Sequence, residues 1–233
     1  CEKNKISPKH GRIVITLVGV AHVINLKAYI ERIIAEENPD IVAVELDYGR
    51  YVALSQRIQG DMPYFYRKMA EMQRNISQMF GTEAGSEMLT AVKIARILGK
   101  EVAFIDMDSQ RIVESIKRNM GLWEKIRFYS SILFAPFIGK KITRKDVENI
   151  ISEEDRYIEE LRRKYPGLVR ALFEEREAFM ARNLLSLPQD KNIMAFVGDG
   201  HLQGLKRRIP DARVIKLREL QQHSVSYSYR ISV

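Results

Sequence analysis

Residues 192–201 read NIMAFVGDGH, an apolar run that ends in Gly198-x-x-His201. Residues 13–22 read IVITLVGVAH and end in the same way, in Gly19-x-x-His22. Both runs are short and bounded by glycine, a pattern that predicts buried strands. Ligands of an open α/β sheet bind outside the carboxyl ends of its strands, so the two histidines are predicted to meet in one site.

Segments of strand and helix character alternate outward from these two runs, an order that builds a parallel sheet. Strands are predicted over residues 13–18, 41–44, 102–105, 193–197 and 214–217. Helices are predicted over residues 24–37, 50–58, 63–78 and 86–98, and a short helix after His201. Residues 109–187 show helical periodicity throughout. We therefore predict one α/β domain over residues 1–233, with a mainly parallel central sheet flanked by helices and an α-helical insertion or cap over residues 109–187.

Composition limits the class of protein. The chain has 233 residues, of which 45% are hydrophobic and 29% charged, and these values suit a globular domain with its own core. The lone cysteine, Cys1, excludes an internal disulfide framework. The net charge of +8 comes from basic residues interleaved with acidic ones, without zinc-finger spacing or an RNA-binding aromatic signature. We therefore predict no nucleic-acid partner.

Residues 120–141 form the longest apolar segment, which is too interrupted for a membrane span. Lys125 and Arg127 break its apolar character, and Pro136 would kink or end a helix. One interpretation is a helix packed within an α-helical layer. The other is a surface that touches a membrane or a second subunit, in which case residues 122–138 are the candidate homodimer interface.

The predicted core strands end beside potential metal ligands or acid–base groups. These residues are Gly19 and His22, Glu45 and Asp47, Asp106 and Asp108, and Gly198 and His201. Histidine and carboxylate ligands suit Zn²⁺, Mn²⁺ or Co²⁺. A glycine three residues before a histidine permits a tight turn or the close approach of another backbone.

Each of these features also has an ordinary structural interpretation. A single Gly-x-x-His is common in a turn between a strand and a helix. Glu45 would also suit the positive end of a helix dipole, and Asp106 or Asp108 would suit a helix N-cap. Because potential ligands or acid–base groups follow all four strands, the sequence favours a shared site.

In this order and spacing, the residues resemble the TraB/Tiki superfamily, which includes pheromone-shutdown proteins, archaeal and eukaryotic TraB-domain proteins, and Tiki metalloproteases. The similarity covers nearly the whole chain. It rests on Gly19-x-x-His22, Glu45-Leu46-Asp47 with Arg50, Gly85-Ser86-Glu87-Met88 before Ala91 and Ala95, Asp106-Met107-Asp108, Glu175-Arg176 with Met180, and Gly198-Asp199-Gly200-His201-Leu202 with Gly204-Leu205. Met107 departs from the Asp-Arg-Asp of relatives, and Arg111 is the candidate to compensate for the missing arginine.

The resemblance implies a divalent-metal-dependent hydrolase of the Tiki type that acts on peptides or proteins. In that interpretation His22 and His201 bind Mn²⁺, Co²⁺ or Zn²⁺, with Glu45 as third ligand or general base. Arg176 would stabilise a developing oxyanion, or else form a helix-surface salt bridge with an acid such as Glu87. Glu87 itself is either a site carboxylate or a helix-start residue.

Two alternatives remain open. The domain could sequester a signalling peptide without cleaving it, or it could hydrolyse esters or amides without a metal, with histidine and glutamate activating water. Archaeal TraB proteins look like this domain followed by membrane helices. The resemblance therefore implies a soluble domain of a membrane-associated protein, whose membrane contacts lie outside this chain.

Overall fold

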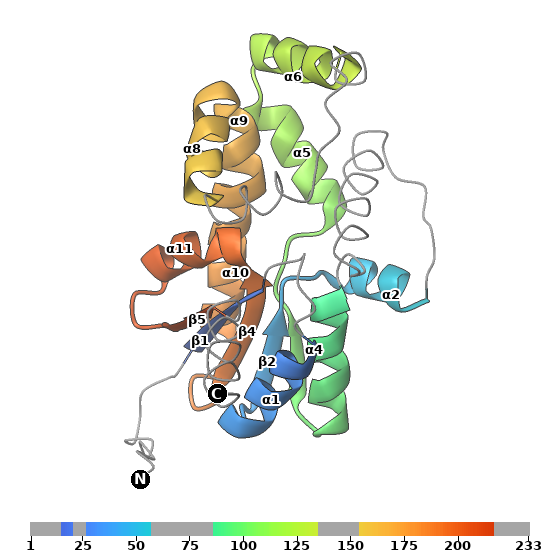
Figure 1. Ribbon diagram of the computed structural model, residues 1–233, viewed down its shortest axis with the longest axis vertical. Helices are drawn as coiled ribbons and strands as arrows, with labels where there is room; N and C mark the ends of the chain where they lie inside the picture. Colours follow the sequence, from blue (N-terminus) through green and yellow to red (C-terminus); the bar gives the residue numbers. More distant parts are fainter. Residues whose placement is uncertain (1–14, 21–26, 57–85, 135–153, 217–233) are drawn as a thin grey trace, which may run out of the picture.

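A five-stranded sheet forms the centre of the fold (Figure 1). The computed structural model describes residues 15–20, 27–56, 86–134 and 154–216. The strands lie in the order β3-β2-β4-β1-β5, and every pairing between them is parallel. They are β1 (Ile15–Val20), β2 (Ile41–Val44), β3 (Glu101–Phe104), β4 (Ile193–Gly198) and β5 (Arg213–Lys216). The predicted α/β fold with a parallel sheet is confirmed, and each strand lies within a residue or two of its predicted position.

Helices cover both faces of the sheet because alternate strand residues point to opposite sides. On one face, α1 (Lys27–Glu37) and α4 (Ser86–Ile97) pack on a core that includes Val18, Val42 and Phe196. On the other face, α10 (Glu175–Ser186) and α11 (Asp199–Arg208) pack on a core that includes Leu17 and Ala195. Near-continuous apolar strands are typical of a parallel sheet that is buried on both sides.

The remaining helices lie beyond the carboxyl ends of the strands (Figure 1). They are α2 (Tyr48–Gln56), α5 (Ser109–Asn119), α6 (Leu122–Phe134), α8 (Glu154–Lys164) and α9 (Pro166–Val169). A π-helical turn, η2 (Arg170–Glu174), joins α9 to α10. The described parts of residues 109–187 are helical, and α10 returns from these outer helices to the face of the sheet. The helix predicted over residues 63–78 lies outside the described residues.

The direction of the strand connections changes between β1 and β4. The chain continues from β1 to α1 on one face of the sheet, and from β4 to α11 on the other. Neighbouring strands whose connections leave to opposite faces form the usual ligand crevice of such sheets. In the β1–β4 register, Gly19 lies opposite Val197 and Val20 opposite Gly198. The strands that precede the two histidines in the sequence therefore lie side by side.

Helix α11 begins earlier than the sequence suggests. It was expected to follow His201, but it begins at Asp199, so His201 lies in its first turn. Asp199 suits that position because an acidic side chain is stabilised at the positive end of the helix dipole. Gly198, the N-cap, has an ordinary φ of −60°. A tight glycine turn is therefore not needed here, and the imidazole is carried by a regular helix.

Gly19 serves instead to bring α11 close to the sheet. A Cβ at this position would lie 2.1 Å from Asp199 Oδ1 and 2.4 Å from Leu202 Cδ1. The first turn of α11, which carries His201, thus packs directly on the end of β1.

This contact predicts a cost for any larger residue at position 19. We expect Gly19→Ala to lower the free energy of unfolding by about 1–3 kcal/mol, because β1 and α11 must separate. Urea denaturation measures the change. Gly121→Ala is the control, since among the described residues nothing lies within 4 Å of its Cβ position. Equal losses in the two variants would contradict this interpretation of Gly19.

None of the described helices is long and apolar enough to cross a membrane.

Candidate functional site

Arg176 lies at the centre of a buried cluster of charged groups beyond the ends of β2 and β3. Its Nη2 donates to Glu45 Oε1 at 2.6 Å and to Asp106 Oδ2 at 2.6 Å, and its Nε donates to Asp106 Oδ1 at 3.1 Å. The exposed fraction of the side chain is 12% for Arg176, 9% for Glu45 and 0% for Asp106. Charge-assisted hydrogen bonds of this kind compensate charges that are removed from water.

The electrostatic balance keeps the guanidinium charged. Burial alone would lower the pKa of Arg176, but the negative charges of Glu45 and Asp106 hold that pKa above its ordinary value. Arg176 is therefore a fixed cation, and its place is set by the two carboxylates.

Glu45 connects the ends of β2 and β4. Its backbone N–H donates to Phe196 O at 3.0 Å, so the hydrogen bonding between the two strands continues past Val44. Its Oε2 accepts a hydrogen bond of 2.7 Å from the N–H of Gly198, the N-cap of α11. The Glu45 side chain thus lies at a helix N-terminus and also within the buried cluster, and its part in catalysis stays a prediction.

His201 completes the cluster from the first turn of α11. Its Nε2 lies 3.2 Å from Arg176 Nη1 and 3.4 Å from Glu45 Oε1. A guanidinium can only donate, so Nε2 must accept, and the proton of the neutral ring is then on Nδ1. The Phe173 ring of η2 packs beside the imidazole, with centroids 5.2 Å apart. The imidazole of His201 therefore contacts both Arg176 and Phe173.

Glu177 is a site residue that the sequence analysis missed. It is buried on α10, with Oε1 3.6 Å from His201 Nδ1 and Oε2 accepting a 2.7 Å hydrogen bond from Arg208 Nη1. A Cβ at residue 204 would lie 1.8 Å from Glu177 Oε2, so glycine is required where the carboxylate crosses α11. Glu177 precedes the buried Met180, Ala181 and Leu184 at helical spacing. The sequence signal that could have identified Glu177 was an acidic residue on the apolar face of a helix.

Asp47 and Arg50 extend the cluster toward solvent. Arg50 donates from its backbone N–H to Asp47 Oδ1 at 3.0 Å and from Nε to Asp47 Oδ2 at 2.7 Å. Its Nη2 donates to Asp106 Oδ2, so Asp106 is shared by two guanidinium groups. At residue 107, where the family resemblance predicts arginine, the Met107 side chain is buried and its N–H donates to Asp106 Oδ1 at 2.8 Å.

The other predicted residues have different positions. Asp108 is the N-cap of α5, where it accepts from Arg111 N–H at 3.0 Å and pairs with the Arg111 side chain at 3.1 Å. Arg111 therefore pairs with Asp108 and does not replace an arginine at position 107. Glu87 is buried in the first turn of α4, and its role in the site stays a prediction. His22 lies outside the described residues.

The described side chains supply an incomplete set of ligands for a divalent metal ion. The described residues contain no group of three histidine, cysteine or carboxylate side chains that could hold a metal. His201 Nε2 and Glu45 Oε1 lie 3.4 Å apart, a separation that suits two ligands of one ion at about 2.0–2.2 Å each. Nε2 has a single lone pair, so an ion bound there would have to displace its contact with Arg176 Nη1. Glu177 Oε1 lies on the Nδ1 side of the ring but at 3.6 Å, so Nδ1 does not make the hydrogen bond to a carboxylate that commonly backs a metal-binding histidine. The third predicted ligand, His22, lies outside the described residues.

Comparisons with known proteins agree with the motif order. The model of the TraB/PrgY/gumN family matches residues 5–211. An uncharacterized protein of Methanocaldococcus jannaschii is 28% identical over 224 residues, which cover 88% of this chain and 56% of that protein. The chain thus spans a little over half the length of this relative. A solved structure of ChaN from Campylobacter jejuni, described for cofacial heme binding, shares 12% identity with a TM-score of 0.44, over 87% of this chain and 79% of that one. On the family match, the chain belongs to the TraB/PrgY/gumN family.

Proposed function

We propose that this domain is a hydrolase of peptides that works with a divalent metal ion held by His22, His201 and Glu45. The observation that carries the proposal is the buried contact of Glu45, Arg176 and His201 at the carboxyl edge of a parallel sheet. Buried titratable groups held together in a crevice are the usual mark of a catalytic site. The family resemblance supports the choice of peptides as substrate.

Glu45 and His201 are the groups suited to move protons. Glu45 Oε1 and His201 Nε2 lie 3.4 Å apart, within reach of one water molecule placed against both. General acid–base catalysis needs such groups at hydrogen-bonding distance from the reacting atoms. When bound at these donors, a divalent ion would supply Lewis acidity toward water and a scissile carbonyl.

Arg176 is best suited to position the other groups. A guanidinium has five N–H donors. The partners of Arg176 are Glu45, two oxygens of Asp106, His201 and the carbonyl of Leu172 at 3.4 Å. Its donors are therefore directed at the protein, which supports a positioning role over the direct oxyanion contact expected from the sequence.

Glu177 should matter for catalysis although it lies behind His201. We expect Glu177→Gln to lower kcat/KM by about 10- to 100-fold, chiefly through kcat, because the imidazole loses the carboxylate on its Nδ1 side. Steady-state kinetics measure the change. Glu174→Gln, on the preceding turn with a side chain 48% exposed, is the matched control. A Glu177→Gln variant as active as the control would contradict this role.

Hydrolysis without a metal is the second candidate. The observation in its favour is that Arg176 N–H groups already bind both Glu45 Oε1 and His201 Nε2. These two atoms have partners without an ion, and glutamate and histidine can activate water if their proton affinities suit the working pH.

One assay separates these candidates from peptide sequestration. The purified chain is incubated with a degenerate peptide mixture, before and after chelation and with Mn²⁺, Co²⁺ or Zn²⁺ added back, and products are detected by mass spectrometry. Cleavage that is lost on chelation and restored by one metal is the result we expect. Cleavage that survives exhaustive chelation favours the metal-free candidate. Retention of intact peptides without any cleavage would contradict hydrolysis and favour sequestration.

A further inference from the structure

Helix α6 has an apolar face that is exposed. Its inner side contacts the neighbouring helices: Glu124 Oε1 accepts from Leu168 N–H at 3.0 Å, and the Phe128 ring meets Tyr165 with centroids 5.6 Å apart. On its other side, Leu122, Trp123 and Ile126 are 71%, 78% and 49% exposed. Their spacing places the three side chains on one face of the helix. Figure 1 shows α6 lying across the end of the molecule that is remote from the sheet.

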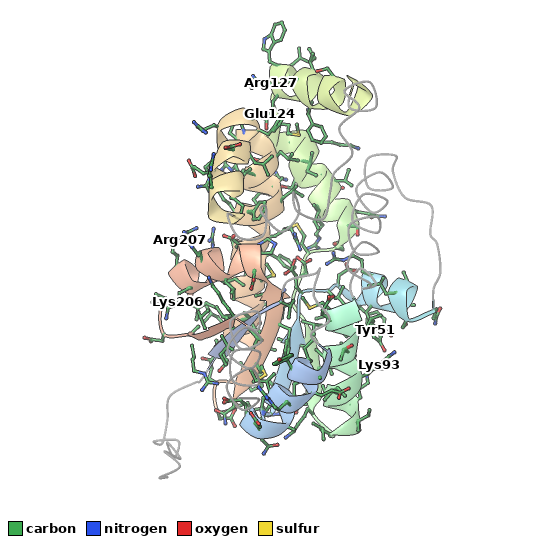
Figure 2. All side chains as sticks on the ribbon, viewed as in Figure 1. Tyr51, Lys93, Glu124, Arg127, Lys206 and Arg207 are labelled. Carbon is green, nitrogen blue, oxygen red and sulfur yellow. The ribbon has the colours of Figure 1, made fainter. Side chains whose placement is uncertain are left out.

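Cationic side chains surround the base of this face. Lys125 Nζ donates to Lys117 O at 2.9 Å. Arg127, labelled beside α6 in Figure 2, donates from Nη1 to Lys164 O at 3.1 Å. These bonds bring positive groups of α6 to the carboxyl ends of α5 and α8, which end in Lys117-Arg118-Asn119 and Arg162-Arg163-Lys164. The acid of α6, Glu124, is engaged at the start of α9. Arg118 pairs with Glu175 and Arg162 with Glu159, and the other lysines and arginines of these segments leave the border of the apolar face net positive.

This charge pattern distinguishes between two occupants. A symmetric dimer would place the same patch of each copy against the other and bring two net-positive borders together. An anionic lipid surface complements the cations, and the apolar side chains can enter the boundary between headgroups and acyl chains. Tryptophan is favoured at that boundary because its ring is apolar and its N–H is polar. We propose that α6 is a membrane-contact element that binds anionic lipid bilayers peripherally.

Trp123 is the single tryptophan of the chain, so its fluorescence reports on this face directly. The full chain is titrated with vesicles of phosphatidylcholine alone and of phosphatidylcholine with phosphatidylglycerol. We expect a blue shift of the emission and protection from acrylamide with the anionic vesicles, weakened at high salt because the attraction is screened. With neutral vesicles we expect a partition coefficient at least about tenfold lower.

The variant Leu122→Glu/Ile126→Glu keeps the fluorophore and should lower the partition coefficient at least about tenfold. Ile97→Glu is the matched control, because Ile97 is 77% exposed at the far end of α4 and should not contact lipid. Circular dichroism checks that each variant remains folded. Equal partition of the two variants, or no spectral change with anionic vesicles, would overturn the proposal. A blue shift that appears without vesicles and rises with protein concentration, together with a doubled solution mass, would identify the face as a dimer interface instead.

Discussion

Replacing Arg176 with alanine should lower the free energy of unfolding at pH 7 by about 3–5 kcal/mol, because it leaves buried carboxylates without their cation. Asp106 would keep the partly exposed Arg50, whereas Glu45 would lose its contact with Arg176 and keep the hydrogen bond from Gly198 N–H. Chemical denaturation at pH 7 measures the loss.

Two further variants test the physical reason for that loss. Arg182→Ala removes an exposed guanidinium from the same helix and should change stability by no more than about 0.5 kcal/mol. Glu45→Gln in the Arg176→Ala background should restore part of the stability, because a neutral amide does not need a cation. A loss in Arg176→Ala no larger than in Arg182→Ala would show that the cluster is not held by this charge.

The second large effect is on catalysis. His201→Ala and Glu45→Gln should each lower kcat/KM for peptide cleavage by at least about a thousandfold, because each removes a group that handles protons or binds the proposed metal. Steady-state kinetics and elemental analysis of the same preparations measure activity and metal content together. His223→Ala, at a histidine without a predicted role, is the control. Full activity and unchanged metal in both site variants would contradict the proposed function.

Much of the fold follows from apolar patterning. Residues 15–20 and 193–198 are buried without interruption, and only a sheet covered on both faces accommodates such strands. The meeting of Glu45 and His201 could be predicted because both follow parallel strands, whose carboxyl ends lie on one edge. The ends of the helices were harder to predict. Helix α11 begins at Asp199, an acid that suits a helix N-terminus, but the glycines on both sides of Asp199 suggested a turn instead.

The partners of Arg176 could not be predicted from the sequence. Its position depends on how α10 returns from the outer helices, and the π-helical turn η2 shifts the helix phase just before it. Helical periodicity tells which residues share a face but does not tell which strand end that face meets. For the same reason the pairing of Arg50 with Asp106, beside the departure at Met107, became apparent only from the structure.

The most direct test of the central claim is a double-mutant cycle on kcat/KM with Glu45→Gln, His201→Ala and the double variant. If the two groups act as one catalytic unit, kcat/KM of the double variant should be no more than about tenfold below that of the less active single variant. Losses that multiply across the two substitutions would show that Glu45 and His201 act independently, and would contradict a single site built on their contact.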